Sequence, residues 1–251
     1  MKFKTYLGKP IEGAYENYLE RAKEKKEPEE KESLLFIPAN INRQDYIKIP
    51  NTDVVIARQE TEKGKDWEAT RYALADNGLF MPTISLFMPY YINVRDAAQG
   101  KATLYTADNK QIPRNEAEEL WKYISTDYKR GCWTWLDAKF SQENNLWKIT
   151  YDHKVAQKGK KLEGKTNNLE DCIRQDCFVN LEFNSQGLPI KKSSSNVYKQ
   201  GENIYYYPPR NGAVARFWAD SVWAYLSCYW GPQDSDASLG VFSCAEGTQK
   251  N

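Results

Sequence analysis

The spacing of apolar residues changes near Gly131, and this change constrains the fold more than any other feature of the sequence. Before it, apolar residues recur at helical spacing and predict helices from Asp66 to Asn77, after Thr83 and from Asn115. After it, alternating segments separated by Gly, Asn and Ser clusters predict strands at Trp133–Phe140, Trp147–His153, Cys177–Phe183 and Asn203–Tyr207. Helices in the N-terminal half and mostly antiparallel strands in the C-terminal half predict an α+β fold rather than alternating βαβ units.

The ends of the predicted helices carry capping residues. Gly78 is expected to end the first helix, because glycine readily adopts the left-handed conformation found at helix C-termini. Thr83 is expected to cap the start of the second helix, which should be broken or kinked at Pro89. Asn115 with Glu118 resembles a capping box at the start of the third helix.

Length and charge limit the classes of function. With 251 residues, of which 41% are hydrophobic, the chain is long enough for a single domain over residues 1–251 with a sizeable core. A formal net charge of +1 gives no global field toward nucleic acid or an anionic membrane. The first residues lead into polar sequence, so we expect no signal peptide. No apolar run approaches the ~20 residues of a membrane span, so we expect no membrane insertion.

The cysteines do not form a recognisable reactive or metal-binding motif. Five cysteines are an odd number spread along the chain, which favours reduced, packed thiols over a disulfide scaffold. A bridge between Cys228 and Cys244 stays open, because both lie in neighbouring strand-like segments. Cys172 and Cys177 are too widely spaced for a CxxC element. No nucleophile, base and orienting group come together, so we expect no catalytic residue, no metal and no cofactor.

One phosphate-binding motif matches in letters but lies in the wrong context. Residues Gly159–Thr166 fit the P-loop pattern. A P-loop follows a buried parallel strand and begins a helix, whereas Trp147–Lys154 alternates like a half-exposed antiparallel strand and Asn167–Asp171 is a poor helix start. We therefore predict a solvated hairpin loop. The lysines of this stretch lack interleaved aromatic residues, so nucleic-acid binding is not expected.

The most informative segment lies near the C-terminus. From Ala224 to Tyr229 small or aliphatic residues alternate with Tyr225, Ser227 and Tyr229, and a strand places these two sets on opposite faces. We expect Ala224, Leu226 and Cys228 to point inward. A second such strand is expected from Asp236 to Val241, with Ala237, Leu239 and Val241 pointing inward.

The residues predicted to point outward have the composition of an antibody paratope. Tyr and Trp give large contact areas at low entropic cost, and Ser and Asp give adaptable polar contacts. A solvent-facing surface with this many aromatic residues is usually an interaction site. The candidate ligand-binding residues are Trp218, Asp220, Ser221, Trp223, Tyr225, Ser227, Tyr229, Trp230, Gln233, Asp234, Ser235, Asp236 and Ser238.

Four segments carry a family resemblance. Gly212–Phe217 and Ala237–Phe242 frame the alternating segment, and Asn77–Thr83 and Trp135–Phe140 precede it. Together they resemble the variable proteins of diversity-generating retroelements, most closely the archaeal branch found in viruses and their hosts. The resemblance implies a C-type lectin fold, a retroelement that rewrites adenine-containing codons, and a variable ligand-binding region at residues 213–245.

The resemblance also separates a fixed scaffold from diversified positions. The diversified set would be the outward residues named above together with Val222. The scaffold would be Ala213–Phe217, Ala224, Leu226, Cys228, Pro232, Ala237 and Leu239–Phe242. Codons of the AAY type can mutate at adenine to Tyr, Ser, Asp or Val but never to Trp or Gln. Trp218, Trp223, Trp230 and Gln233 therefore need a different template codon, or are fixed.

A diversified surface implies a protein or glycan ligand, as on a host or neighbouring cell. The expected absence of a signal peptide fits a virion component or an intracellular protein equally well. Two alternatives stay open. One is an enzyme of the formylglycine-generating type, which shares a lectin-like fold and uses reactive cysteines. The other is a binding module with a fixed interface.

Overall fold

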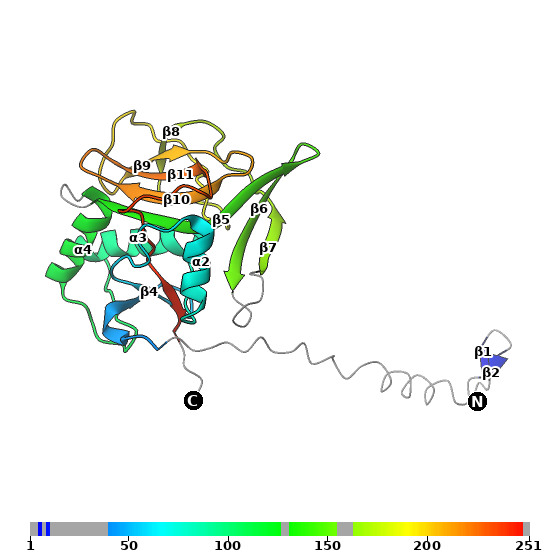
Figure 1. Cartoon of the computed structure of the whole chain (residues 1–251), viewed down its shortest axis with the longest axis horizontal. Coiled ribbons are helices and arrows are strands. Elements are labelled where there is room, and N and C mark those ends of the chain that lie inside the picture. Colours follow the sequence, from blue (N-terminus) through cyan, green and yellow to red (C-terminus); the bar gives the residue numbers. More distant parts are fainter. Residues whose placement is uncertain (1–4, 7–8, 11–39, 127–130, 155–162, 248–251) are drawn as a thin grey trace. The chain divides into compact units, whose positions relative to one another are not determined.

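The computed structural model describes residues 5–6, 9–10, 40–126, 131–154 and 163–247, which fall into two compact units, 1–36 and 37–251 (Figure 1). The first unit holds an antiparallel pair of two-residue strands, β1 (Thr5–Tyr6) and β2 (Lys9–Pro10). The candidate site and all other elements belong to the second unit.

The second unit has a mixed α+β architecture, as predicted. Within the described residues it contains a 3-10 turn, three α-helices and ten strands. In chain order these are η1 (Arg43–Asp45), β3 (Tyr46–Lys48), β4 (Val54–Ala57), α2 (Trp67–Ala75), α3 (Ile84–Ala98), α4 (Arg114–Thr126), β5 (Cys132–Glu143), β6 (Leu146–Lys154), β7 (Glu163–Asn168), β8 (Cys177–Asn180), β9 (Asn203–Tyr207), β10 (Val214–Ala219), β11 (Ala224–Trp230) and β12 (Cys244–Glu246).

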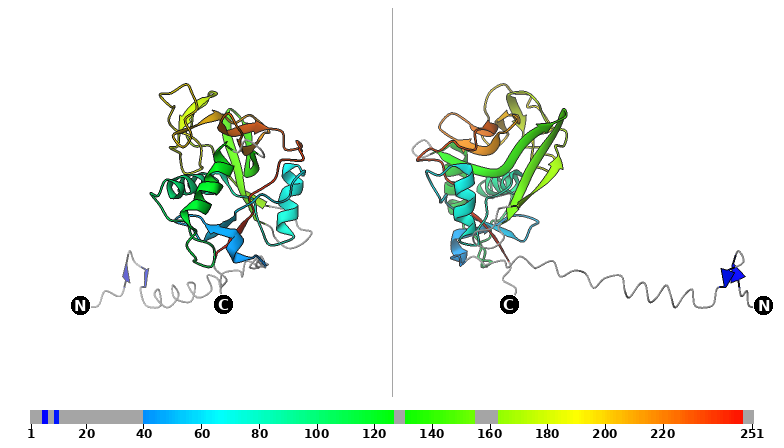
Figure 2. Two further views of the ribbon diagram at one scale, coloured as in Figure 1. Left: turned by 90° about the vertical axis from the view of Figure 1, so that its left-hand side faces the viewer. Right: turned by 45° about the vertical axis from the view of Figure 1, so that its right-hand side comes forward.

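Two sheets organise this unit. The larger sheet has the strand order β7-β6-β5-β10-β11-β9-β8, and every neighbouring pair is antiparallel except β11 and β9. The smaller sheet has the order β12-β4-β3, so β12, near the C-terminus, pairs with β4 near the start of the unit. Helices α3 and α4 lie between the central strands of the large sheet and the small sheet (Figures 1 and 2).

The core lies between α3, α4 and one face of the large sheet. Phe217 of β10 is fully buried, and its ring packs against Phe87 and Tyr91 of α3 at centroid distances of 5.0 and 5.1 Å. Leu226 and Cys228 of β11 are also fully buried, as predicted for the inward face of that strand. Residues i and i+2 of a strand share a face, so this core fixes which side chains of β10 and β11 point to the opposite side.

Two of the predicted helix caps are confirmed. Thr83 caps α3, and its hydroxyl accepts the amide hydrogen of Leu86 at 3.2 Å. Gly78 has a φ of 68° and lies where the chain leaves α2. The amide of Gly78 donates to the carbonyl of Ala75, and that of Leu79 to the carbonyl of Leu74, both at 3.0 Å. These paired bonds form a Schellman motif, which requires a residue such as glycine in the left-handed conformation.

Two other expectations about the helices differ from the structure. The chain is not broken at Pro89, and α3 continues to Ala98, because Tyr90, Tyr91 and the rest of its buried face pack into the core while Pro89 itself is exposed. Helix α4 begins at Arg114, so Asn115 lies inside the helix and does not cap it.

The strand prediction for Asp236–Val241 is also wrong. This segment forms a turn followed by isolated bridges at Gly240 and Val241, and Ala237 is exposed. The local cause is Asp236, whose carboxylate accepts the amide and hydroxyl hydrogens of Ser238 at 2.8 and 2.5 Å. Aspartate in such a turn competes with strand pairing. Leu239 and Val241 are buried, as predicted.

Other strand boundaries agree more closely. β9 matches the predicted strand, while β8 ends at Asn180 rather than Phe183. The P-loop-like sequence ends in β7, which contains Gly164, Lys165 and Thr166 and pairs antiparallel with β6, so it begins a strand and not a helix. Residues 159–162 of that motif lie outside the described residues. No helix in the described part of the chain is both long and apolar enough to cross a membrane.

Candidate functional site

The face of the large sheet opposite α3 carries a continuous group of aromatic side chains. Phe217 points toward α3, so Trp218 points away from it. In the register of the sheet, Trp218 lies opposite Trp133 of β5 and Tyr225 of β11, and Tyr225 lies opposite Tyr205 of β9. Cross-strand partners share a face. We call this group the aromatic face, and its members are Trp133, Phe178, Tyr205, Tyr207, Trp218, Trp223, Tyr225, Tyr229 and Trp230.

The rings of the aromatic face form one network. Trp133 and Trp218 stack with centroids 5.1 Å apart, and Trp218 meets Tyr225 edge-on at 4.9 Å. Tyr225 in turn contacts Tyr207 at 5.8 Å. From Tyr207 the network branches to Tyr205, Trp223 and Phe178 on one side and to Tyr229 and Trp230 on the other. Each such pair is worth about 0.5–1.5 kcal/mol beyond its buried area, so the network fixes the surface that the rings present.

Part of the same side of the sheet is covered and does not face solvent. Trp67 of α2, Trp135 of β5 and Leu239 belong to one buried apolar cluster. The indole nitrogen of Trp67 donates to the carbonyl of Leu136 at 2.9 Å, which fastens α2 to β5. The aromatic face therefore begins where this cover ends, at Trp133 and Trp230, which pack against the same cluster.

Most of the predicted site residues are exposed or half-exposed along the aromatic face and its loops, but two are buried. The accessible ones are Trp218, Asp220, Ser221, Val222, Trp223, Tyr229, Trp230, Gln233, Asp234, Ser235, Asp236 and Ser238. Tyr225 and Ser227, predicted to project into solvent, are only 6% and 0% exposed. The Tyr225 ring is enclosed by Trp218 and Tyr207, and Ser227 lies opposite Arg216 in the strand register.

Two loops of predicted site residues are built by their own aspartates. The Asp220 carboxylate accepts the amide hydrogens of Val222 and Trp223 at 2.7 and 3.1 Å and thereby shapes the turn between β10 and β11. The Asp234 carboxylate accepts the amide hydrogen of Gly231 at 3.1 Å. Bonding to Ser238 holds the pKa of the exposed Asp236 carboxyl below its usual value. These aspartates therefore order the two loops through hydrogen bonds to backbone amides.

Arg216 lies beneath the aromatic face and was assigned only to the scaffold by sequence reasoning. Its side chain is 1% exposed. Its guanidinium carbon is 3.1 Å from the ring centroid of Trp230, 4.6 Å from that of Trp133 and 5.7 Å from that of Trp218. Burial lowers the pKa of Arg216 to about 10, against the opposing influence of Tyr225, Tyr229 and Asp234. The group remains a cation at neutral pH.

Several hydrogen-bond donors around Arg216 have no partner. Within the described residues these are Nε and Nη1 of Arg216, the indole nitrogens of Trp133 and Trp230, and the hydroxyl of Ser227. No salt bridge among the described residues includes Arg216. Buried polar groups are nearly always satisfied in proteins, so this cluster of donors is the most unusual feature of the site.

The contribution of other strands to the site was not predicted. Tyr205 and Tyr207 of β9, Phe178 of β8 and Trp133 of β5 complete the network. The sequence does indicate part of this arrangement. Tyr205 and Tyr207 are two residues apart and therefore share one face of a strand, and the same holds for Arg216 and Trp218. Whether these residues lie beside β11 depends on the order of the strands in the sheet, and residue spacing alone does not predict that order.

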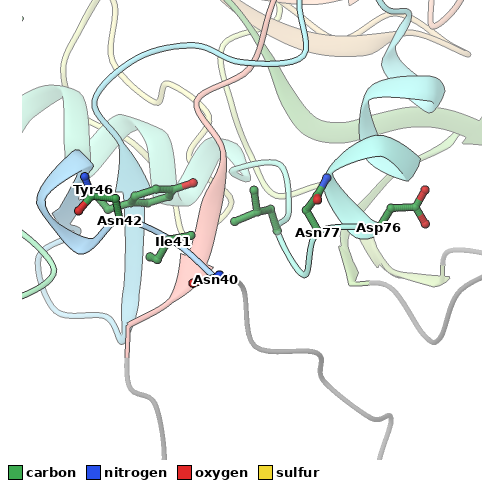
Figure 3. Close-up of a pocket in the computed structure, with 7 residues that line it drawn as sticks. Asn40, Ile41, Asn42, Tyr46, Asp76 and Asn77 are labelled. Atoms are coloured by element: carbon green, nitrogen blue, oxygen red, sulfur yellow. The ribbon is translucent and has the colours of Figure 1, made fainter.

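A concavity lies beside the small sheet (Figure 3). Its volume is about 440 Å³, and it is lined by Asn40, Ile41, Asn42, Tyr46, Asp76, Asn77 and Leu79. Its polar groups are largely used within the protein. Asn42 donates to Asp45 at 2.8 Å, the Tyr46 hydroxyl bonds to Ser243 at 2.9 Å, and Asn77 donates to the carbonyl of Ala73 at 3.0 Å. It is therefore a weaker candidate than the aromatic face.

The thiols are not arranged as reactive groups. All five cysteines are free, so the bridge between Cys228 and Cys244 that the sequence left open is not formed. These two residues lie in different sheets, and burial raises the pKa of both thiols well above the usual value. Cys132 lies beside Glu60, and burial and that neighbouring carboxylate raise its pKa as well. Reactive cysteines have lowered pKa values.

Within the described residues no group of three or more His, Cys, Asp or Glu side chains is placed to hold a metal ion. Comparison with known protein families, with characterised proteins and with solved structures gave no match for this chain.

Proposed function

We propose that this chain is a non-enzymatic binding protein whose ligand contacts the aromatic face and the loops 220–223 and 231–238. The observation that carries the proposal is the network of nine aromatic side chains on the side of the sheet away from α3, bordered by exposed Ser and Asp residues. Tyrosine and tryptophan dominate the energetics of binding surfaces because they bury large areas with few rotatable bonds.

We also propose that the scaffold is of the C-type lectin type and that a diversity-generating retroelement rewrites residues 213–245. Support comes from how burial is distributed in this region. Phe217, Leu226 and Cys228 are fully buried, as a fixed scaffold requires, whereas Val222 is 61% exposed and residues 233–238 are all exposed. Substitution at exposed positions usually changes stability little, so such a region tolerates repeated rewriting.

The burial of Tyr225 and Ser227 reduces the number of positions that can vary without affecting the packing of the protein. Both belong to the candidate diversified set, but a rewritten codon at either would alter packing as well as binding. We therefore expect natural variation to concentrate at exposed positions such as Ser221, Val222 and Ser235.

Sequencing the DNA around the gene tests the retroelement. We expect a near-copy of the codons for residues 213–245 and a reverse transcriptase gene nearby, with the two copies differing almost only at adenines. Differences confined to codons of exposed residues would support the surface assigned above. If neither a copy nor a reverse transcriptase is found, the diversified surface is excluded and a fixed interface becomes the better description.

The ligand is expected to be a protein or a glycan on a host or neighbouring cell. A display library of the 213–245 region, varied at the exposed positions and selected against a defined cell-surface protein and a defined glycan, tests this capacity directly. Specific binders that lose affinity on substitution of Trp223 would support the surface. If selected binders depend on residues outside the aromatic face and its loops, the proposed site is wrong.

The formylglycine-generating alternative receives less support. That chemistry uses reactive cysteines, whereas burial raises the pKa of the Cys228 and Cys244 thiols and the two lie in different sheets.

A further inference from the structure

We infer that Arg216 is an anion anchor beneath the aromatic face, and that the ligand inserts a carboxylate of an aspartate or glutamate side chain against it when the Trp230 ring moves aside. This inference rests on the proposed binding function and names the chemistry of the ligand group.

The site carries a buried positive charge. Arg216 is fully enclosed, and no carboxylate among the described residues forms a salt bridge with it. Asp234 and Asp236 of the neighbouring loop are the acids that interact with it at longer range, and their carboxylates are engaged by Gly231 and Ser238. The Tyr225 side chain also bonds to Arg216 but is neutral. A buried cation without a carboxylate partner is costly and does not by itself stabilise a fold.

The site also has a surplus of hydrogen-bond donors. The unpartnered groups are the Nε and Nη1 nitrogens of Arg216, the indole N–H of Trp133 and of Trp230, and the Ser227 hydroxyl. Four of these five can only donate. Stacking with the Trp rings compensates the charge of Arg216 in part but leaves these N–H groups without hydrogen-bond acceptors. A negatively charged group rich in acceptors would satisfy the charge and the donors of Arg216, Trp133 and Ser227 once the Trp230 ring has moved aside. A carboxylate also matches the planar guanidinium in geometry.

Access of a ligand to Arg216 depends on the Trp230 ring. Trp230 covers the guanidinium, with 3.1 Å between its ring centroid and the Arg216 carbon, and it is itself half-exposed. It ends β11 and is followed by the exposed loop 231–238. A rotation of this one side chain would expose Arg216 without disturbing the strand ladder, and side-chain rotation is fast compared with binding.

The surface around Arg216 is wide. The aromatic face draws residues from five adjacent strands, β8, β9, β11, β10 and β5. Strands are spaced by about 4.8 Å, so the face spans roughly 20 Å. That width suits a protein interface better than a single sugar, which is why we assign the carboxylate to a protein side chain.

The test uses two small probes of nearly the same shape, the charged N-acetyl-aspartate methylamide and the neutral N-acetyl-asparagine methylamide. Indole N–H signals of Trp133 and Trp230 are followed by NMR during titration of the full chain, after assignment through Trp133→Phe and Trp230→Phe. We expect a saturable shift with the aspartate probe and none with the asparagine probe. Arg216→Met should weaken the response at least about tenfold, as loss of a charge-assisted pair implies.

The matched control is Arg210→Met. Arg210 also lies over a ring of the aromatic face, 4.8 Å from the centroid of Tyr229, but it is exposed. This variant should keep the full response. Equal loss in both variants, or an unchanged response in Arg216→Met, would overturn the anchor.

Trp230→Ala provides a second and independent variant, since it changes a half-exposed position and does not depend on folding without Arg216. Removing the cover should strengthen binding of the aspartate probe several-fold, and weaker or unchanged binding would overturn the role of Trp230.

Sodium glucuronate is titrated in parallel. A response to glucuronate without one to the aspartate probe would overturn the protein ligand in favour of an acidic sugar. Failure of every anion to shift the indole signals would remove the anchor while leaving the aromatic face as a binding surface, which the DNA and display experiments test separately.

Discussion

Val222 and Tyr225 lie three residues apart in the candidate site, yet their surroundings differ. Val222 is 61% exposed at the turn between β10 and β11, whereas Tyr225 is 6% exposed and contacts the rings of Trp218 and Tyr207. Alternation along a strand assigns Tyr225 to the outer face correctly but does not say whether other rings cover it. Burial therefore divides the candidate residues into those that support the surface and those that a ligand can touch.

Replacing Tyr225 with alanine should destabilise the protein by about 3 kcal/mol, because the ring leaves a cavity among its neighbours. Val222→Ala, at the exposed turn, should change stability by less than about 0.5 kcal/mol. Urea denaturation of the two variants measures the difference. If Tyr225→Ala were as stable as the parent protein, its ring would not be part of the packed face.

Ser227 gives an opposite expectation. Its hydroxyl is buried without a partner, so the folded state bears the cost of desolvating it. Ser227→Ala should leave stability unchanged or raise it by up to about 1 kcal/mol. A loss of more than about 1 kcal/mol in the same denaturation assay would mean that the hydroxyl has a partner in the free protein, such as an ordered water.

Among the elements, α3 shows how tertiary packing outweighs a local signal. Proline lacks an amide hydrogen, so Pro89 cannot donate to the carbonyl four residues earlier. The helix nevertheless continues, because Phe87, Met88, Tyr90 and Tyr91 are all buried in the core. Thr83 and Gly78, by contrast, act through bonds to residues within five positions in the chain, and those caps could be predicted from sequence.

Pro89→Ala should stabilise the protein by about 1–3 kcal/mol, since alanine restores the missing helical bond and has a higher helix propensity. Pro89 is exposed, so little packing is lost. The thermal midpoint should rise accordingly. A lower midpoint would show that the core requires the helix geometry that proline imposes.

For the strands too, some features follow from nearby residues and others from pairing between distant segments. β9 and β11 could be placed from their alternation alone. The wrong strand prediction for Asp236–Val241 also has a local cause, because hydrogen bonds from Ser238 to Asp236 form a turn that alternation does not reveal. The composition of the aromatic face is non-local. It depends on β9 joining β11 in parallel and on β5 joining β10, and neither pairing is written in the spacing of residues.

At the scale of the whole molecule, buried titratable groups set the response to alkaline pH. Burial raises the pKa of Cys132, Cys228 and Cys244 well above 9, and it raises those of Tyr91 and Tyr206 well above 10. The unfolded chain releases these protons at lower pH than the folded chain. The stability that these groups contribute is therefore complete below about pH 9 and is lost as pH rises toward their folded pKa values.

We expect the free energy of unfolding to fall steadily from about pH 9 upward, first through the thiols and then through the tyrosines. Urea titrations at several pH values between 7 and 10.5 measure it. A variant with alanine at the three buried cysteines should show a later onset, near pH 10. Stability that stayed constant over this range in the parent protein would contradict the burial of these groups.

The pairing of β12 with β4 has a geometric consequence for how the protein can be displayed. Cys244 lies opposite Ile56, so the chain enters and leaves the larger unit through the same small sheet. That sheet lies on the far side of α3 and α4 from β9 and β11 (Figure 1). A fusion partner or particle joined near Asn40 or Gly247 would therefore sit at the back of the unit. The aromatic face would then point away from the attachment point and stay accessible to a ligand.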